Sequence, residues 1–121
     1  MSPSKKLFEM ECQDDTVILI AKADLSEFEY EALEEEAAEA MSLLCAGDHK
    51  NVVVDLSETD YCGSTALGLF LKLWKQSRSY NGAMAFCGLS ENELEIFATM
   101  RLELLWPICE TREQALEAVQ N

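Results

Sequence analysis

Basic residues are scarce in this sequence. Nine Lys and Arg stand against 23 Asp and Glu, which gives a net charge of −14 at pH 7. A surface of that sign repels nucleic-acid phosphates and anionic membranes, so we expect neither as a partner. Seven of the acids are glutamates in the stretch 27–39, which has no Lys or Arg. They form either one solvated helix face or a surface that steers a basic protein partner.

Long hydrophobic runs are also missing. None reaches the ~18 residues that a membrane-spanning helix requires. The N-terminal stretch 1–6 has two lysines with no apolar segment after them, so no secretory signal is evident. We therefore expect a cytoplasmic protein without membrane insertion.

Clustered metal ligands are absent as well. His49 is the only histidine, and no Cys-x-x-Cys occurs. Zinc sites need such clusters, so we expect no metal and no cofactor. The widely spaced cysteines are expected to be reduced thiols, buried or half-buried; they are Cys12, Cys45, Cys62, Cys87 and Cys109. Cys62 lies nearest the candidate site and is the thiol to test for reactivity.

Glycine and proline are few, and no linker, internal repeat or low-complexity tract is present. A chain of 121 residues suits one domain, 1–121. A chain of this length can bury a core without disulfides or metal.

Hydrophobic periodicity predicts strands alternating with helices. Short, mostly apolar runs predict strands at 7–12, 16–21, 52–56, 83–87 and 104–109. Capping boxes at Ser26–Glu29, Ser90–Glu93 and Thr111–Gln114 predict three helix starts, and Gly47 is expected to end the first of these helices. A fourth helix is expected over about 65–79. The order β-β-α-β-α-β-α-β-α predicts an α/β fold with a mixed, mostly parallel sheet of four to five strands.

The most informative segment runs from Asn51 to Trp74. A buried strand is followed by a polar turn, and Ser64 and Thr65 then open a helix. Open α/β sheets place their working sites at this edge, and a helix start favours a phosphate. The alternative is structural, because Ser is also a preferred helix N-cap.

The helix that begins near Ser64 is expected to have two different faces. A broad apolar side should pack on the sheet; it consists of Ala66, Leu67, Phe70, Leu73, Trp74 and Ser77. A ridge should project on the opposite side, formed by Ser64, Gly68, Lys72, Lys75 and Ser79. Glycine inside a helix costs about 1 kcal/mol relative to alanine. Gly68 therefore suggests close approach of another backbone, either a partner's or a loop of the same domain.

These residues resemble the STAS domain family, the anti-sigma factor antagonists of bacteria. The family has a strand ending Asp-Leu-Ser, a turn, and then Asp-Ser-Ser/Thr-Gly-Leu-Gly at a helix start. Here the stretch 52–68 reads VVVDLSETDYCGSTALG. The segments 81–90 and 111–116 resemble the family's later glycine turn, buried strand and helix starts, so the resemblance covers nearly the whole chain.

The resemblance implies a partner-switching mechanism. The unmodified antagonist binds an anti-sigma factor that is a serine kinase of the histidine-kinase ATPase type. Phosphorylation of the first hydroxyl of the motif, here Ser64, releases it, and a serine phosphatase is a further candidate partner. Thr65 is the alternative phosphoacceptor. The expected partner-binding residues are Asp24, Tyr61, Cys62, Gly63, Ser64, Thr65, Gly68, Lys72 and Lys75. A monomer or weak dimer is expected.

The chain departs from the family pattern at three places. Gly63 replaces the usual Asp, Ala66 replaces the usual Gly, and the stretch 21–24 keeps only Asp24 of the common Gly-x-Leu/Ile-Asp. The alternative function is therefore a STAS docking subunit of a signalling, transport or lipid-trafficking complex that is not phosphorylated.

Two other classes fit less well. A phospho-Asp receiver would use Asp55 at a strand end, with an acidic pair after its first strand and a lysine late in the chain. Here the pair Asp14 and Asp15 precedes a strand and sits in a predicted hairpin turn, and no Lys occurs after Lys75. An enzyme would need a catalytic set that one histidine cannot complete, or a cleft that shifts a carboxyl pKa. We expect no enzymatic activity and no catalytic residues.

Overall fold

The computed structural model describes residues 7–26, 29–44 and 49–120. The strands are β1 (Phe8–Gln13), β2 (Thr16–Ala21), β3 (Asn51–Asp55), β4 (Met84–Cys87) and β5 (Ile108–Cys109). The helices are α1 (Tyr30–Leu44), α2 (Ser64–Ser79), α3 (Glu91–Thr99) and α4 (Arg112–Gln120), and a 3-10 helix, η2 (Leu102–Leu104), precedes β5. The predicted element order is confirmed.

The five strands form one mixed sheet in the order β1-β2-β3-β4-β5. β1 and β2 pair antiparallel through a tight turn at Asp14, whose φ of 54° is left-handed. The other neighbours pair in parallel. The carboxyl ends of β2, β3 and β4 therefore meet at one edge, as the predicted crossovers require.

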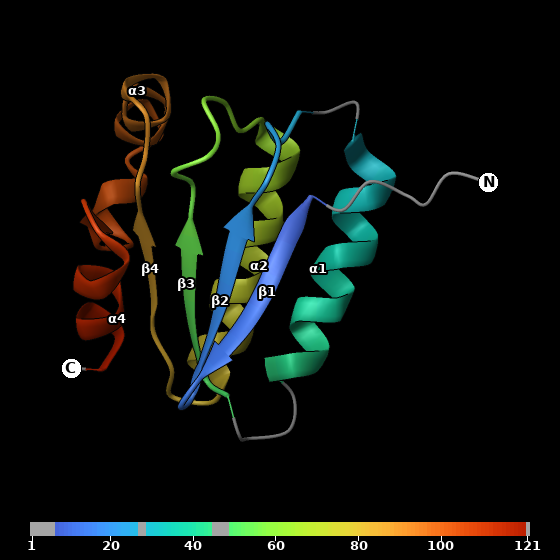
Figure 1. Ribbon diagram of the computed structural model, residues 1–121, viewed down its shortest axis with the longest axis vertical. Helices are drawn as coiled ribbons and strands as arrows, with labels where there is room; N and C mark the ends of the chain where they lie inside the picture. The colour runs from blue at the N-terminus through green and yellow to red at the C-terminus, as the bar shows by residue number, and fades with distance from the viewer. Residues whose placement is uncertain (1–6, 27–28, 45–48, 121) are drawn as a thin grey trace.

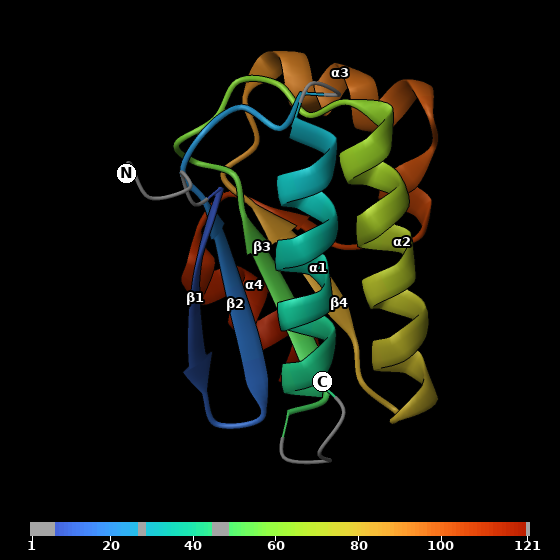
Figure 2. The ribbon, with the colours of Figure 1, turned by 90° about the vertical axis from the view of Figure 1, so that its right-hand side faces the viewer.

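Helices cover the two faces of the sheet unequally. α1 and α2 lie side by side on one face, and α4 lies on the other (Figures 1 and 2). α3 lies beyond the carboxyl end of β4 (Figure 1). The larger core is on the α1–α2 side and the smaller one is under α4. The largest buried side chains include Phe70, Phe86, Phe97 and Trp106.

The predicted packing face of α2 is correct in outline. Ala66, Leu67, Phe70, Leu73 and Ser77 are buried, whereas Trp74 is only half-buried. Leu69 is also buried, which the prediction missed.

The prediction for the last strand was too long. The pairing in β5 is confined to Ile108 and Cys109, and Leu104, placed in the strand, is 75% exposed in the 3-10 turn. The N–H of Trp106 donates to the carbonyl of Leu102, so the chain is still turning there. Apolar composition alone did not separate this turn from a strand.

The capping boxes predicted the helix starts better than apolar composition predicted the last strand. At Ser90 the hydroxyl accepts from the Glu93 N–H while the Glu93 carboxylate accepts from the Ser90 N–H, so this box is confirmed. Thr111 and Gln114 exchange the same pair of bonds at the start of α4. In the box at Ser26–Glu29, residues 27–28 lie outside the described part of the chain, as does Gly47.

Glu36 contradicts the expectation that the α1 glutamates are solvated. The residue is 7% exposed and its carboxylate accepts from the N–H groups of Leu7 and Phe8, each at 2.8 Å. Glu36 thus satisfies two backbone donors where β1 begins. Glu31, Glu34, Glu35 and Glu39 are exposed, as expected.

Candidate functional site

Ser64 is the first residue of α2 and is exposed. Its N-cap is Gly63, with extended backbone and no capping side chain, so the alternative in which Ser64 caps the helix is wrong. The first helical bond runs from the Leu67 N–H to the Gly63 carbonyl at 3.1 Å. The earlier N–H groups have no acceptor within the helix, and they make this end of α2 electropositive.

The loop that leads to Ser64 is held by the segment after β2. Leu25 forms a parallel bridge with Cys62. Its N–H donates to the Tyr61 carbonyl at 3.0 Å, and its carbonyl accepts from the Gly63 N–H at 2.7 Å. Asp24, one residue earlier, accepts from the Asp60 N–H at 2.8 Å. Asp24 and the residues around Ser64, far apart in sequence, therefore share one surface.

The same loop is tied to the start of α3. The Thr59 hydroxyl donates to the Glu93 carboxylate at 2.5 Å, and Glu93 is fully buried. Asp60 accepts from the Ser90 hydroxyl through its carbonyl and from the Asn92 amide through its carboxylate. Burial raises the pKa of Glu93 despite the hydrogen bonds from Ser90 and Thr59, which act to lower it.

Thr59, Asp60 and Glu93 were not identified from the sequence. The capping box marked Glu93 as a helix-start residue, but no local signal showed that its second oxygen reaches a residue 34 positions away.

The predicted partner-binding residues differ in exposure. Those that are exposed are Asp24, Tyr61, Ser64, Gly68, Lys72 and Lys75. Thr65 is half-buried, and Cys62 and Gly63 are buried. We correct the prediction for Cys62, whose thiol cannot reach a partner at 1% exposure. Burial, with a smaller effect of the Glu93 carboxylate, raises the pKa of this thiol to about 12.

Gly68 lies one turn after Ser64 in open space. A Cβ atom built there meets no atom of the described residues within 4 Å, the backbone of α2 itself aside. The explanation by a loop of the same domain is therefore wrong for the described part of the chain. Together with Lys72 and Lys75, the residue forms an exposed ridge that begins at Ser64.

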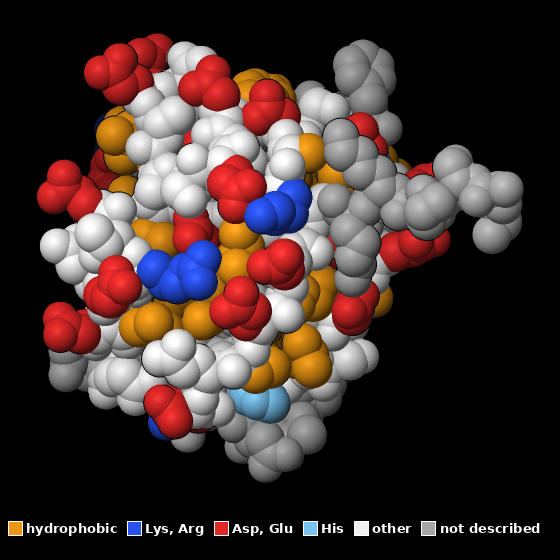
Figure 3. Space-filling model, viewed as in Figure 1, with side chains coloured by type: hydrophobic (Ala, Val, Ile, Leu, Met, Phe, Trp, Pro, Cys, Tyr) orange, Lys and Arg blue, Asp and Glu red, His pale blue; other side chains and the backbone are white. Residues whose placement is uncertain are grey.

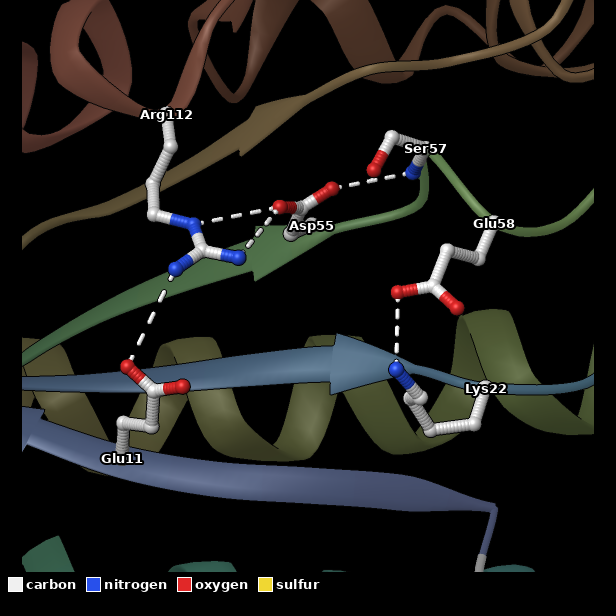
Figure 4. Close-up of polar contacts among 6 residues, drawn as sticks. All are labelled: Glu11, Lys22, Asp55, Ser57, Glu58 and Arg112. Carbon is white, nitrogen blue, oxygen red and sulfur yellow. Dashed lines mark hydrogen bonds and ion pairs between the residues drawn. The ribbon is translucent and has the colours of Figure 1, made fainter.

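The opposite face of the sheet carries a separate polar cluster. On it, the central Lys and Arg side chains are bordered by carboxylates (Figure 3). Arg112 donates through Nε and Nη2 to one Asp55 oxygen at 3.2 and 2.9 Å, and the Ser57 N–H donates to the other (Figure 4). Lys22 pairs with Glu58 at 2.8 Å. Asp55 thus joins α4 to the sheet. Both of its oxygens are engaged in structural hydrogen bonds, which argues against the phospho-Asp receiver.

Among the described residues, no three His, Cys, Asp or Glu side chains lie close enough to hold a metal ion. No helix in the described ranges has both the length and the apolar character needed to cross a membrane. Cys12 is exposed, contrary to the expectation for the thiols, whereas Cys87 is buried and Cys109 half-buried. Cys45 lies outside the described residues.

Comparison with known proteins gives consistent results. A family model described as STAS domain matches residues 8–115. BtrV of Bordetella bronchiseptica, assigned by its name to the anti-sigma factor antagonists, is 31% identical over 72 residues, which span 60% of this chain and 62% of BtrV.

Solved structures share the fold at low identity. The anti-sigma factor antagonist SpoIIAA in its unphosphorylated form has a TM-score of 0.80 at 19% identity, covering 93% of this chain and 96% of SpoIIAA. Bacillus SpoIIAA in the phosphorylated form has a TM-score of 0.73 at 19% identity, covering 92% and 97%. An anti-sigma factor antagonist from Mycobacterium paratuberculosis has a TM-score of 0.80 at 18% identity, covering 99% and 98%.

Proposed function

The chain belongs to the STAS domain family, and from this premise we propose that it is an anti-sigma factor antagonist whose docking is switched off by phosphorylation of Ser64. The unmodified protein binds an anti-sigma factor, which then releases its sigma factor. The observation that carries the proposal is the exposed hydroxyl residue at the first position of α2, one turn from the open Gly68.

The docking surface comprises the loop before α2 and the exposed ridge of α2. Tyr61, Ser64 and Gly68 are its centre, and Lys72 and Lys75 extend it along the helix. Asp24 lies at its edge, held there by the hydrogen bond from Asp60. Gly68 allows a partner's backbone to approach α2 closely, which explains a glycine inside a helix.

Phosphorylation changes this surface without refolding it. A phosphate adds about −1.5 to −2 charges at pH 7. The positive end of α2 stabilises the added charge, because the first N–H groups of a helix point outward along its axis. Release of the partner then follows from the bulk and charge of the phosphate at the contact. The phosphorylated form of SpoIIAA, a protein of the same fold, supports this type of switch.

The kinase in this proposal is the anti-sigma factor itself, of the histidine-kinase ATPase type, and a serine phosphatase resets the switch. The test is the intact mass of the protein after incubation with that kinase and ATP. We expect a gain of one phosphate that Ser64→Ala abolishes and Thr65→Ala does not. If Ser64→Ala still gains a phosphate, another residue is the phosphoacceptor and the proposed site is wrong.

A docking subunit that is never phosphorylated is the second candidate. Gly63 favours it, because the family usually has Asp before the phosphorylated hydroxyl. Binding to the anti-sigma factor without any phosphate gain, under conditions in which the kinase phosphorylates another substrate, would select this function.

A further inference from the structure

The two helices on the α1–α2 face carry opposite charge. α1 contains five glutamates and no Lys or Arg. α2 contains Lys72, Lys75 and Arg78 and no Asp or Glu, although the whole chain has a net charge of −14. The helices run side by side on one face of the sheet (Figure 2). Glu34 of α1 and Lys72 of α2 border the line where the helices meet, and we call these two sides the acidic rim and the basic rim.

A groove of about 470 Å³ lies between these rims. Leu69, Met41 and Ala37 give it an apolar floor, and the short side chain of Ala38 leaves its wall open. Glu34 stands on the α1 rim and Lys72 on the α2 rim, and both are exposed.

The basic rim is available for a partner. No carboxylate of the described residues forms an ion pair with Lys72 or Lys75, whereas Lys22 and Arg112 on the opposite face are engaged by Glu58 and Asp55 (Figure 4). Lys72 also belongs to the ridge that starts at Ser64. The groove is therefore continuous with the surface proposed for docking.

We propose that this groove receives an amphipathic helix of the anti-sigma factor. The helix places an apolar ridge against Leu69 and Met41, acidic side chains toward α2 and basic side chains toward α1. Helices pack by inserting side-chain ridges into grooves, so the groove between α1 and α2 can accept the ridge of a third helix. The paired rims fix the direction of the incoming helix, because reversing its charge pattern brings like charges together.

The inference rests on the proposed function but adds a contact that does not involve phosphate. A second copy of this chain is disfavoured as occupant, because two molecules of net charge −14 repel each other. Ala38→Trp should weaken binding of the native protein and of Ser64→Asp by the same factor, since Ala38 lies on α1 and Ser64 lies at the start of α2.

The experiment measures binding of the purified anti-sigma factor by calorimetry. Ala38→Trp fills the groove and should weaken binding about tenfold or more. Its matched control is Ala98→Trp, which changes an exposed alanine of α3. The exchange Glu34→Lys with Lys72→Glu keeps the net charge but reverses the rims, and it should also weaken binding about tenfold. Its control exchanges Glu95 and Arg101 in the same way.

The outcomes separate the two proposals. If the native protein binds no anti-sigma factor of its genome, the proposed function and the groove both fail. If Ser64→Asp and Gly68→Trp weaken binding while the groove variants bind as the native protein does, the groove is overturned and the function stands. A self-association in sedimentation that Ala38→Trp abolishes assigns the groove to a second copy and overturns the inference. Should Ala38→Trp not fold, Glu34→Lys decides, because Glu34 lines the groove and is not part of the docking surface around Ser64. Its control is Glu95→Lys, which changes the net charge equally at an exposed position of α3.

Discussion

In the proposed switch, Ser64 is distinguished, at the scale of single residues, by its position more than by its chemistry. Any exposed serine carries the same hydroxyl, but this one opens a helix next to a glycine that leaves the surface bare. A negative group at position 64 lies at the start of α2 and next to the surface at Gly68 where we propose that the partner docks.

Ser64→Asp adds one negative charge at this position and should weaken binding of the anti-sigma factor about tenfold, since it mimics part of a phosphate. Binding is measured by calorimetry at one fixed salt concentration. Thr99→Asp is the matched control, because Thr99 is an exposed hydroxyl residue at the end of α3, outside the proposed docking surface. Equal affinities for Ser64→Asp and the native protein would refute the phosphorylation switch.

Cys62 should not react in the folded protein. Its pKa of about 12 leaves almost no thiolate at pH 8, and the side chain is buried. We expect iodoacetamide to alkylate the exposed Cys12 under native conditions and to reach Cys62 only after unfolding in urea. Peptide mass spectrometry separates the two sites. Alkylation of Cys62 in the folded protein at the rate of Cys12 would contradict its placement.

Helices and strands, at the scale of elements, are joined by a few buried carboxylates. Glu36 ties α1 to the start of β1, Asp55 ties β3 to α4, and Glu93 ties α3 to the loop before α2. Each bond links residues at least 28 positions apart in the sequence.

Glu36→Ala should destabilise the fold by about 2–5 kcal/mol, because it leaves two buried N–H donors, those of Leu7 and Phe8, without an acceptor. Urea unfolding measures the change. Glu35→Ala is the control on the neighbouring, exposed position and should change the free energy of unfolding by less than about 0.5 kcal/mol. Equal effects of the two substitutions would show that the bonds to β1 contribute nothing.

Arg112→Ala should cost about 1–3 kcal/mol at pH 7, since it leaves Asp55 buried without its cation. Burial acts to raise the pKa of Asp55, but hydrogen bonds from Ser57 and Arg112 outweigh it and lower the pKa below the usual range. A lowered carboxyl pKa stabilises the fold above the unfolded pKa, near 3.9, and this contribution is lost as pH falls through the folded pKa.

Urea unfolding from pH 7 to pH 3 tests that dependence. The difference between the native protein and Arg112→Ala should narrow toward pH 3. Glu11→Ala, which removes the 3.8 Å partner of Arg112 at a half-exposed site, should cost less than about 1 kcal/mol. A difference that stays constant with pH would exclude the ion pair as its cause.

These tertiary bonds mark the limit of what the sequence could predict. The turn at Asn81 and Gly82 and the caps at Ser90 and Thr111 were predictable, because their signals lie within four residues. Gly82 is required there, since a Cβ would lie 1.8 Å from the Lys50 carbonyl oxygen. The burial of Glu36 and the contact of Glu93 with Thr59 were not predictable, because they depend on which elements pack together.

The candidate site was predictable only where its residues lie close together in the sequence. Ser64 and Gly68 lie on one helix, so helical spacing placed them on one ridge. The adjacency of Asp24 came from the family resemblance, and the structure supplies its cause in the bridge between Leu25 and Cys62. The expected burial of the Cys62 thiol is confirmed, and it is this burial that excludes the side chain from the partner-binding set.

Charge, at the scale of the whole molecule, opposes the fold. The net charge of −14 is spread over 121 residues, and the printed sequence has few cations to offset it. Within the described ranges, ion pairs engage Lys22 and Arg112 but not Lys72 or Lys75. Repulsion among carboxylates should therefore outweigh attraction at low ionic strength.

Added salt should then stabilise the protein. Raising NaCl from about 0.01 M to about 0.15 M shortens the Debye length from about 30 Å to about 8 Å, which screens repulsion between distant carboxylates more than the short ion pairs. We expect the Tm at pH 7 to rise by about 2–6 °C, the shift that a gain below about 1 kcal/mol gives in a domain of this size. KCl should act like NaCl, because the effect is screening and not binding of one ion. A Tm that falls with either salt would show that attractive ion pairs dominate, and Lys72 and Lys75 would then need acidic partners beyond the ion pairs of the described residues.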